Sequence, residues 1–131
     1  MILGCGLDLM DVGRFEREVA RRGGSLLGEL FSPAELALCQ SRRRPAEGYA
    51  MGYAAKEALF KALGTGKIGR MAWHDVGVGW EGVGSRAAIA LAGETEQAAA
   101  AMGVTAVRLA LSVTREQAVA WVVTLGVHDA R

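Results

Sequence analysis

Two side chains of opposite charge, Glu57 and Lys61, lie four positions apart in the alanine-rich segment of residues 54–66. If this segment is a helix, both side chains project from one flank of it. The apolar neighbours of the pair follow the i, i+3, i+4, i+7 spacing of a buried stripe: Ala55, Ala58, Leu59 and Ala62. A carboxylate and an ammonium at the rim of such a stripe could hold a metal ion and a phosphate together. The structural alternative is an exposed ion pair that contributes only about 0.3–0.5 kcal/mol.

A second acid, Asp8, ends the apolar segment of residues 2–9, which is predicted to be a strand. Gly4 and Gly6 in this segment allow another backbone or a ligand to approach closely. Alone, an acid at a strand end usually caps the next turn or faces solvent. Together with Glu57, Asp8 would make a hard-oxygen site for Mg²⁺, which needs only one or two protein carboxylates. The same pair would be a poor zinc site.

Two glycines, Gly64 and Gly66, flank Thr65 directly after the predicted end of this helix. Gly64 in the left-handed conformation would serve as the helix C-cap, which accounts for at least one of the glycines. The functional interpretation adds Thr65 and Lys67 as phosphate donors, with the glycines letting backbone amides approach. The two interpretations are compatible. The sequence has no Gly-x-x-x-x-Gly-Lys-Ser/Thr motif, which disfavours a nucleotide triphosphatase.

The other polar residues give no support for a hydrolase. Ser85 and Ser112 have no histidine placed by the sequence to activate them. His74 is followed by Asp75, but adjacent residues on a strand point to opposite faces, so we expect a surface histidine rather than a catalytic dyad.

Composition indicates one ordinary soluble globular domain over residues 1–131. The chain is 51% hydrophobic with a net charge of +1, which argues against bulk nucleic-acid binding. It contains no apolar run near the roughly 20 residues of a membrane span and no secretory signal at its start. Cys5 and Cys39 are expected to be small buried residues in a reducing compartment, which points to the cytoplasm.

Helix signals dominate the first half of the chain and strand signals the second. Asp11 is the expected N-cap of a helix over residues 11–22 that stops at Gly23, and Ser32 is the N-cap of one that ends in the arginines of residues 42–44. Further helices are predicted over residues 47–63 and 94–101. Strands are predicted over residues 2–9, 76–78, 87–91, 107–113 and 118–127, the last two forming a hairpin. This order predicts an α+β fold with a mainly antiparallel sheet packed with helices.

Three blocks of the sequence carry a family resemblance: Gly6-Leu7-Asp8, Phe31-Ser32-x-x-Glu35, and Ala54-Ala55-Lys56-Glu57 running on to Gly64-Thr65-Gly66. Together they resemble the holo-acyl-carrier-protein synthases, the small stand-alone phosphopantetheinyl transferases of bacterial fatty-acid synthesis. The likeness covers nearly the whole chain, in order. The 4′-phosphopantetheinyl transferase fold is therefore expected.

The resemblance implies a transfer of 4′-phosphopantetheine from coenzyme A to a serine of an apo acyl carrier protein, with release of adenosine 3′,5′-bisphosphate. Asp8 and Glu57 would hold Mg²⁺ against the pyrophosphate, and Lys61 would neutralise the charge on the transferring and leaving phosphates. Glu57 or a metal-bound water could take the serine proton. Four further residues are implied to border the coenzyme A pocket: Gly64, Thr65, Gly66 and Ser112.

The resemblance also implies a homotrimer with active sites at its subunit interfaces. The acyl carrier protein is strongly acidic, so a basic dock is expected on the helix of residues 11–22, from Arg14, Arg21 and Arg22. A solvated helix face is the alternative for these arginines.

Three positions depart from the family. Gly52 and Val113 stand where the family often has an arginine and a histidine, and Gly84-Ser85-Arg86 replaces a glycine-lysine-proline. The cationic contact missing at Gly52 could come from residues 42–44. These departures are the support for an alternative function, a non-catalytic module that binds coenzyme A or a carrier protein on the same fold. A nucleic-acid binder using residues 42–44 is disfavoured by the net charge.

Overall fold

The computed structural model describes residues 1–81 and 87–127. Its elements follow the chain in the order β1 (Ile2–Asp11), α1 (Val12–Arg22), α2 (Gly24–Leu30), α3 (Pro33–Gln40), α4 (Pro45–Leu63), the 3₁₀ helix η1 (Trp73–Asp75), β2 (Val76–Trp80), β3 (Ala87–Leu91), α5 (Gly93–Ala101), β4 (Val104–Val113) and β5 (Gln117–Gly126). β1, β5 and β4 form an antiparallel sheet in that order, and β2 pairs with β3 in a second one. The predicted α+β class and the β4–β5 hairpin are confirmed.

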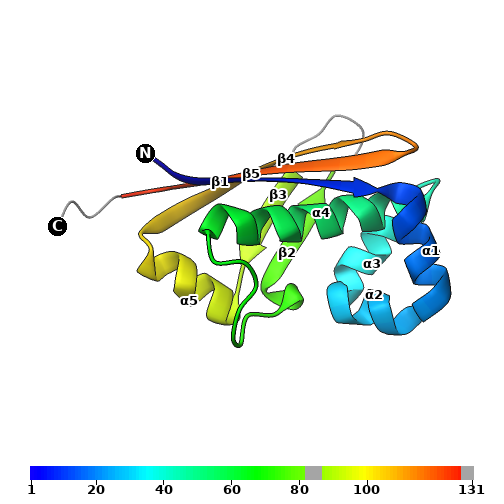
Figure 1. Ribbon diagram of the computed structural model, residues 1–131, viewed down its shortest axis with the longest axis horizontal. Helices are drawn as coiled ribbons and strands as arrows, with labels where there is room; N and C mark the ends of the chain where they lie inside the picture. Colours follow the sequence, from blue (N-terminus) through cyan, green and yellow to red (C-terminus); the bar gives the residue numbers. More distant parts are fainter. Residues whose placement is uncertain (82–86, 128–131) are drawn as a thin grey trace.

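Helix α4 lies along one face of the three-stranded sheet and is the centre of the fold (Figure 1). Its small residues allow close packing, and the predicted stripe of Ala55, Ala58, Leu59 and Ala62 is buried. The helix begins at Pro45, two residues earlier than predicted, because Pro45 occupies the first helical turn. It ends as predicted at Gly64, which has a left-handed φ of 79°.

The glycines of β1 let α4 approach the strand directly. A Cβ at Gly6 would overlap the carbonyl oxygen of Ala58 and lie 2.7 Å from the nitrogen of Ala62. A Cβ at Gly4 would likewise overlap the carbonyl oxygen of Ala62. The close approach expected at these positions is therefore made by another backbone, that of α4.

Two expectations for β1 are corrected. Asp8 does not end the strand, because β1 pairs with β5 as far as Asp11 opposite Gln117, and Asp8 itself lies opposite Ala120. The residue at the strand end is Asp11, whose side chain caps α1 as predicted. Cys5 is exposed rather than buried, since it lies on the face of the sheet that points away from α4, whereas Cys39 is buried as expected.

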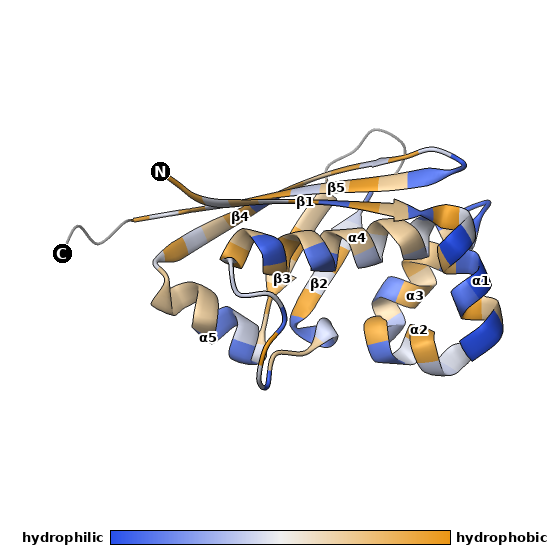
Figure 2. Cartoon of the chain, in the orientation of Figure 1, coloured by the Kyte–Doolittle hydropathy of each residue, from blue (hydrophilic) through white to orange (hydrophobic). Residues whose placement is uncertain are grey.

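Helices α1, α2 and α3 gather at one end of α4, and α5 lies toward the other (Figure 1). Helix α2 was not predicted: Gly23, with a φ of 66°, ends α1, and the chain then turns into a second short helix that buries Leu26 and Leu30. The capping box of Ser32 and Glu35 at the start of α3 is confirmed. In Figure 2 the hydrophilic bands of this end are plainest on α1.

His74 is exposed, as expected, and its Nε2 donates to the carbonyl oxygen of Gly28 at 2.7 Å. Asp75 instead accepts from Thr95 and from the backbone of Ala72, so the two neighbours form no catalytic dyad. Among the helices of the described residues, none has both the length and the apolar character needed to cross a membrane. The departure at Gly84-Ser85-Arg86 lies outside the described residues.

Candidate active site

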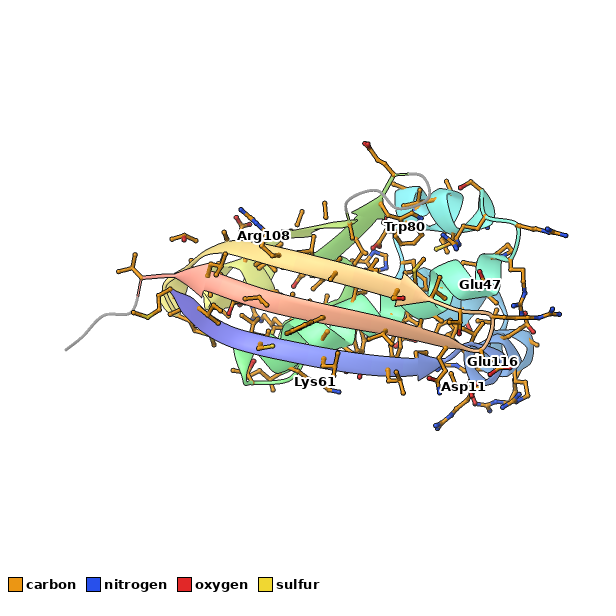
Figure 3. The ribbon with its side chains drawn as sticks, turned by 90° about the horizontal axis from the view of Figure 1, so that it is seen from above. Asp11, Glu47, Lys61, Trp80, Arg108 and Glu116 are labelled. Carbon is orange, nitrogen blue, oxygen red and sulfur yellow. The ribbon has the colours of Figure 1, made fainter. Side chains whose placement is uncertain are left out.

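Lys61 on α4 reaches across to Asp8 on β1. Its Nζ donates to Asp8 Oδ1 at 2.7 Å and to the carbonyl oxygen of Leu7 at 3.2 Å. The side chain of Asp8 is only 13% exposed, whereas that of Lys61 is 53% exposed and lies beside β1 at the open edge of the sheet (Figure 3). The close contact between β1 and α4 thus brings together two of the predicted site residues that are far apart in the sequence.

Glu57, one turn before Lys61 on α4, is bound by a tyrosine instead of by the lysine. The hydroxyl of Tyr53 donates to Glu57 Oε1 at 2.8 Å. Within residues 1–81 and 87–127, Glu57 and Lys61 form no ion pair with each other, so the simple i,i+4 pair is not what the structure contains.

The hydroxyl of Tyr53 lies in an acidic environment. Burial raises the pKa of Tyr53 well above its usual value, and the hydrogen bond to Glu57 and the negative charges of Glu57 and Asp8 raise it further. Tyr53 therefore stays protonated, and donates, at any physiological pH. Asp8 and Glu57 both belong to the pair of elements β1 and α4, and Lys61, one turn after Glu57, reaches Asp8.

The residues present suit a magnesium ion. Asp8 and Glu57 each have one oxygen engaged by a protein donor, and in the described part of the chain no hydrogen bond is made to Asp8 Oδ2 or Glu57 Oε2. No group of three or more histidine, cysteine or acidic side chains gathers within the described ranges, which fits an ion that takes few protein ligands better than it fits zinc. Lys61 already holds a positive charge against Asp8, which indicates that this place favours cations.

The segment after α4 has the structural role expected of it. The amide of Gly64 donates to the carbonyl of Lys61 at 3.0 Å, and that of Gly66 to Phe60 at 3.3 Å, which closes the helix end. The hydroxyl of Thr65 donates to the carbonyl of Gly66 at 2.9 Å. Lys67, expected as a phosphate donor, has its Nζ 5.5 Å from the centre of the Trp73 ring. The phosphate role of these residues stays a prediction.

Ser112 is not brought to the other site residues within one chain. It is exposed on β4, and its neighbours Leu111 and Val113 are the residues that pack against the core. Ser112 therefore lies on the face of the sheet opposite α4, whereas Asp8 accepts a hydrogen bond from α4. Val113, one of the departures from the family, is a packing residue in this structure.

The predicted docking arginines lie on α1 beside a cavity of about 560 Å³. Arg14 and Arg22 line this cavity, whereas Arg21 forms an exposed ion pair with Glu18 at 2.8 Å. Arg22 contacts Glu29 of α2 at 3.2 Å. The walls of the cavity are mixed, with the polar residues Asp11, Glu18, Glu29 and Gln117 beside the apolar and aromatic residues Leu9, Met10, Phe15, Leu26, Leu30, Tyr53 and Trp73.

Sequence reasoning missed the role of Lys56, whose side chain is completely buried. Its Nζ donates to Glu35 Oε1 at 3.0 Å and to the carbonyls of Trp73 at 3.0 Å and Val76 at 2.7 Å. Three acceptors match the three hydrogens of an ammonium group, although burial lowers its pKa. The available signal was the adjacent pair Lys56 and Glu57, whose side chains point roughly 100° apart, in a helix that is apolar on nearly all sides.

Glu35 connects this buried pair to β2 and to the start of its own helix. Besides Lys56, its carboxylate accepts the backbone amide of Ser32 at 2.9 Å and that of Val78 at 3.0 Å. The sequence analysis assigned Glu35 to the capping box alone. In the structure it also fixes α3 against α4 and β2.

Comparisons with known proteins agree with this arrangement. The model of the 4′-phosphopantetheinyl transferase superfamily matches residues 4–121. A holo-[acyl-carrier-protein] synthase of Desulforudis audaxviator is 46% identical over 131 residues, covering 100% of this chain and 98% of that protein. Among solved structures, the synthase of Neisseria meningitidis superposes with a TM-score of 0.85 at 27% identity, covering 95% of this chain and 99% of the other. The Helicobacter pylori synthase, solved in complex with coenzyme A, has a TM-score of 0.77 at 26% identity and coverages of 92% and 99%.

The chain therefore belongs to the 4′-phosphopantetheinyl transferase superfamily. The predicted family, its fold and the class of transferase are confirmed. Coenzyme A and an acyl carrier protein, Mg²⁺, the homotrimer and the role of each site residue are matters for a proposal.

Proposed function

We propose that this chain is a holo-acyl-carrier-protein synthase, which transfers 4′-phosphopantetheine from coenzyme A to a serine of an apo acyl carrier protein. The observation that carries the proposal is the ion pair between Asp8 and Lys61, which lies one turn from Glu57. A relative that matches the full length of the chain is a synthase of this name. The structures of such relatives with coenzyme A support the donor.

The reaction is a displacement at phosphorus. The serine oxygen of the carrier protein forms a bond to the phosphorus nearer the pantetheine while its proton passes to Glu57 or to water, and the bond from that phosphorus to the bridging oxygen breaks. Adenosine 3′,5′-bisphosphate leaves with the electron pair. The protein contributes mainly position and charge in such transfers.

Each site residue has a distinct part in this proposal. The free oxygens of Asp8 and Glu57 would hold Mg²⁺, which when bound supplies positive charge to the pyrophosphate. Lys61 is exposed enough to turn from Asp8 to a phosphate oxygen, where its charge offsets the charge that develops on the leaving group. Gly64, Thr65 and Gly66 follow Lys61 and would border the coenzyme A pocket.

Position 52 is a glycine, so the positive charge that faces the nucleotide end of coenzyme A has to come from other side chains. A Cβ at Gly52 would lie 2.9 Å from Cε1 of Phe31, so an arginine there would not fit without moving that ring. The arginines of residues 42–44 supply the charge at the start of α4, where Arg44 Nη1 contacts Glu47 Oε2 at 3.1 Å and the carbonyl of Arg115 at 3.2 Å.

The homotrimer is proposed because one face of the sheet is apolar and uncovered in a single chain. Leu7, Leu9 and Trp121 are each more than half exposed on the face that points away from α4. Burial of such a face against other copies is favourable. Ser112 lies on the same face, so subunit contact is the way for it to reach a neighbour's site. The cytoplasm is the proposed location.

Intact mass spectrometry of an apo acyl carrier protein, incubated with this chain, coenzyme A and Mg²⁺, tests the proposal. Transfer adds the mass of phosphopantetheine to the carrier serine, whereas the alternative binding module adds nothing covalent. Asp8→Ala and Glu57→Gln should abolish transfer while leaving the fold intact, and Lys61→Ala should lower turnover substantially. Glu94→Gln, an exposed acid at the start of α5, is the control. Full activity of Asp8→Ala or Glu57→Gln would refute the metal assignment.

A further inference from the structure

The hydroxyl of Tyr53 donates a hydrogen bond to one carboxylate oxygen of Glu57. The distance is 2.8 Å, and the two residues lie one turn apart on α4. A hydrogen bond to an ionised carboxylate is stronger than one between neutral groups. It occupies Oε1 of Glu57 and leaves Oε2 for another ligand.

The ring of Tyr53 is fixed between aromatic side chains from other elements. Its centre lies 5.5 Å from that of Phe15 on α1 and 5.4 Å from that of Trp73 on η1. Trp73 in turn meets Phe60 edge to face at 5.6 Å. Contacts with two other rings restrict the rotation of the phenol, so its hydroxyl is a donor at a well-defined position.

We propose that Tyr53 is a positioning residue for the divalent-cation site. Its hydroxyl selects one rotamer of Glu57 and so presents the second carboxylate oxygen to the cation before the cation binds. This inference rests on the proposed role of Glu57 as a metal-binding residue. Carboxylates that bind metals are themselves held by hydrogen bonds, and losing such a partner typically weakens metal binding about 10–100-fold.

The variant Tyr53→Phe removes the hydroxyl and keeps the aromatic contacts. We expect the dissociation constant for Mn²⁺ to rise by roughly tenfold, the lower end of that range, because Glu57 is only half-buried. Binding is measured from the EPR signal of free Mn²⁺, with the full chain and coenzyme A but without carrier protein, so that no turnover occurs. The matched control is Tyr49→Phe, one turn earlier on α4, where the ring stacks on Phe31.

The transfer assay gives a second measurement. For Tyr53→Phe the Mg²⁺ concentration at half-maximal rate should rise by about tenfold, the rate should recover as Mg²⁺ reaches saturation, and the KM for coenzyme A should stay that of the wild type. A merely structural loss would instead lower the unfolding temperature and weaken coenzyme A binding together with metal binding, and that result would overturn the inference.

The experiment separates this inference from the function on which it rests. If Tyr53→Phe binds Mn²⁺ like the wild type while Glu57→Gln binds it more weakly, the metal site stands and the role of Tyr53 is wrong. If Glu57→Gln also binds Mn²⁺ like the wild type, the metal assignment fails and the inference fails with it.

Discussion

Replacing Gly6 with alanine should push strand β1 away from helix α4 and separate the two halves of the site. The added Cβ would overlap the carbonyl oxygen of Ala58 and lie 2.7 Å from the nitrogen of Ala62. Both atoms belong to the backbone of α4, so no side-chain rotation can relieve the contact. Since ordinary contacts of a Cβ begin near 3.4 Å, the helix must retreat by more than half an ångström.

This retreat acts on stability and on activity through different contacts. Overpacking between two backbones costs about 1–3 kcal/mol, which for a chain of this length corresponds to an unfolding temperature roughly 5–10 °C lower. The contact of Lys61 with Asp8, 2.7 Å long, bridges the same gap and would be stretched. Because displacements near 1 Å can lower rates by about 100-fold, turnover should fall by roughly 10–100-fold.

The assay compares Gly6→Ala with Gly79→Ala, a strand glycine of β2 whose added Cβ would meet no non-neighbouring atom of the described residues within 4 Å. Both proteins are tested by thermal unfolding and by phosphopantetheine transfer at a temperature where each is folded. Gly79→Ala should resemble the wild type in both measurements. Wild-type turnover in Gly6→Ala would contradict the claim that this contact positions the site, whatever the variant's stability.

Three further predictions concern the core and the surface. Lys56→Met leaves the carboxylate of Glu35 buried without its cation, so the free energy of unfolding should fall by about 3–5 kcal/mol. In urea denaturation this loss appears as a lower midpoint with an unchanged m-value. A loss smaller than about 1 kcal/mol would contradict the pairing. Burial raises the pKa of the Cys39 thiol from 9.0 to about 12, so above pH 9 the unfolded chain releases a proton that the folded chain keeps. The free energy of unfolding is therefore at its full value below pH 9 and falls as the pH rises from 9 towards 12. Between pH 7 and pH 10 the wild type should lose about 1.4 kcal/mol more unfolding free energy than Cys39→Ala, and parallel losses would refute this. Arg14→Ala combined with Arg21→Ala should slow association with the acidic carrier protein and weaken its salt dependence, and stopped-flow rates equal to wild type would leave these arginines as a solvated face.

The features that the sequence predicted well depend on local chemistry. Asp11, Ser32 and Gly64 mark helix ends because each satisfies backbone groups within a few residues of itself. The β4–β5 hairpin follows from two apolar segments joined by a short polar turn. None of these needs knowledge of what lies elsewhere in the chain.

The features that were missed depend on residues distant in the sequence. Helix α2 forms from a glycine-containing segment of low helical propensity because Leu26 and Leu30 reach the core. The close approach at Gly6 could be predicted, but its partner, α4, is more than fifty positions away. Cys5 was expected inside because its type is usually buried, whereas its position on β1 places it on the outer face of the sheet.

The buried Lys56 and its neighbour Glu57 on α4 are linked by helix geometry. Consecutive residues of a helix point roughly 100° apart, so the direction of Glu57 is determined once Lys56 is fixed. Lys56 is fixed by three acceptors from α3, η1 and β2, which lie on the core side of the helix. The Glu35–Lys56 pair therefore helps to fix the rotation of α4 about its own axis, and with it the direction in which Glu57 leaves the helix. A buried ion pair is a weak source of stability compared with apolar packing, so we infer that this pair serves mainly to specify the orientation of α4.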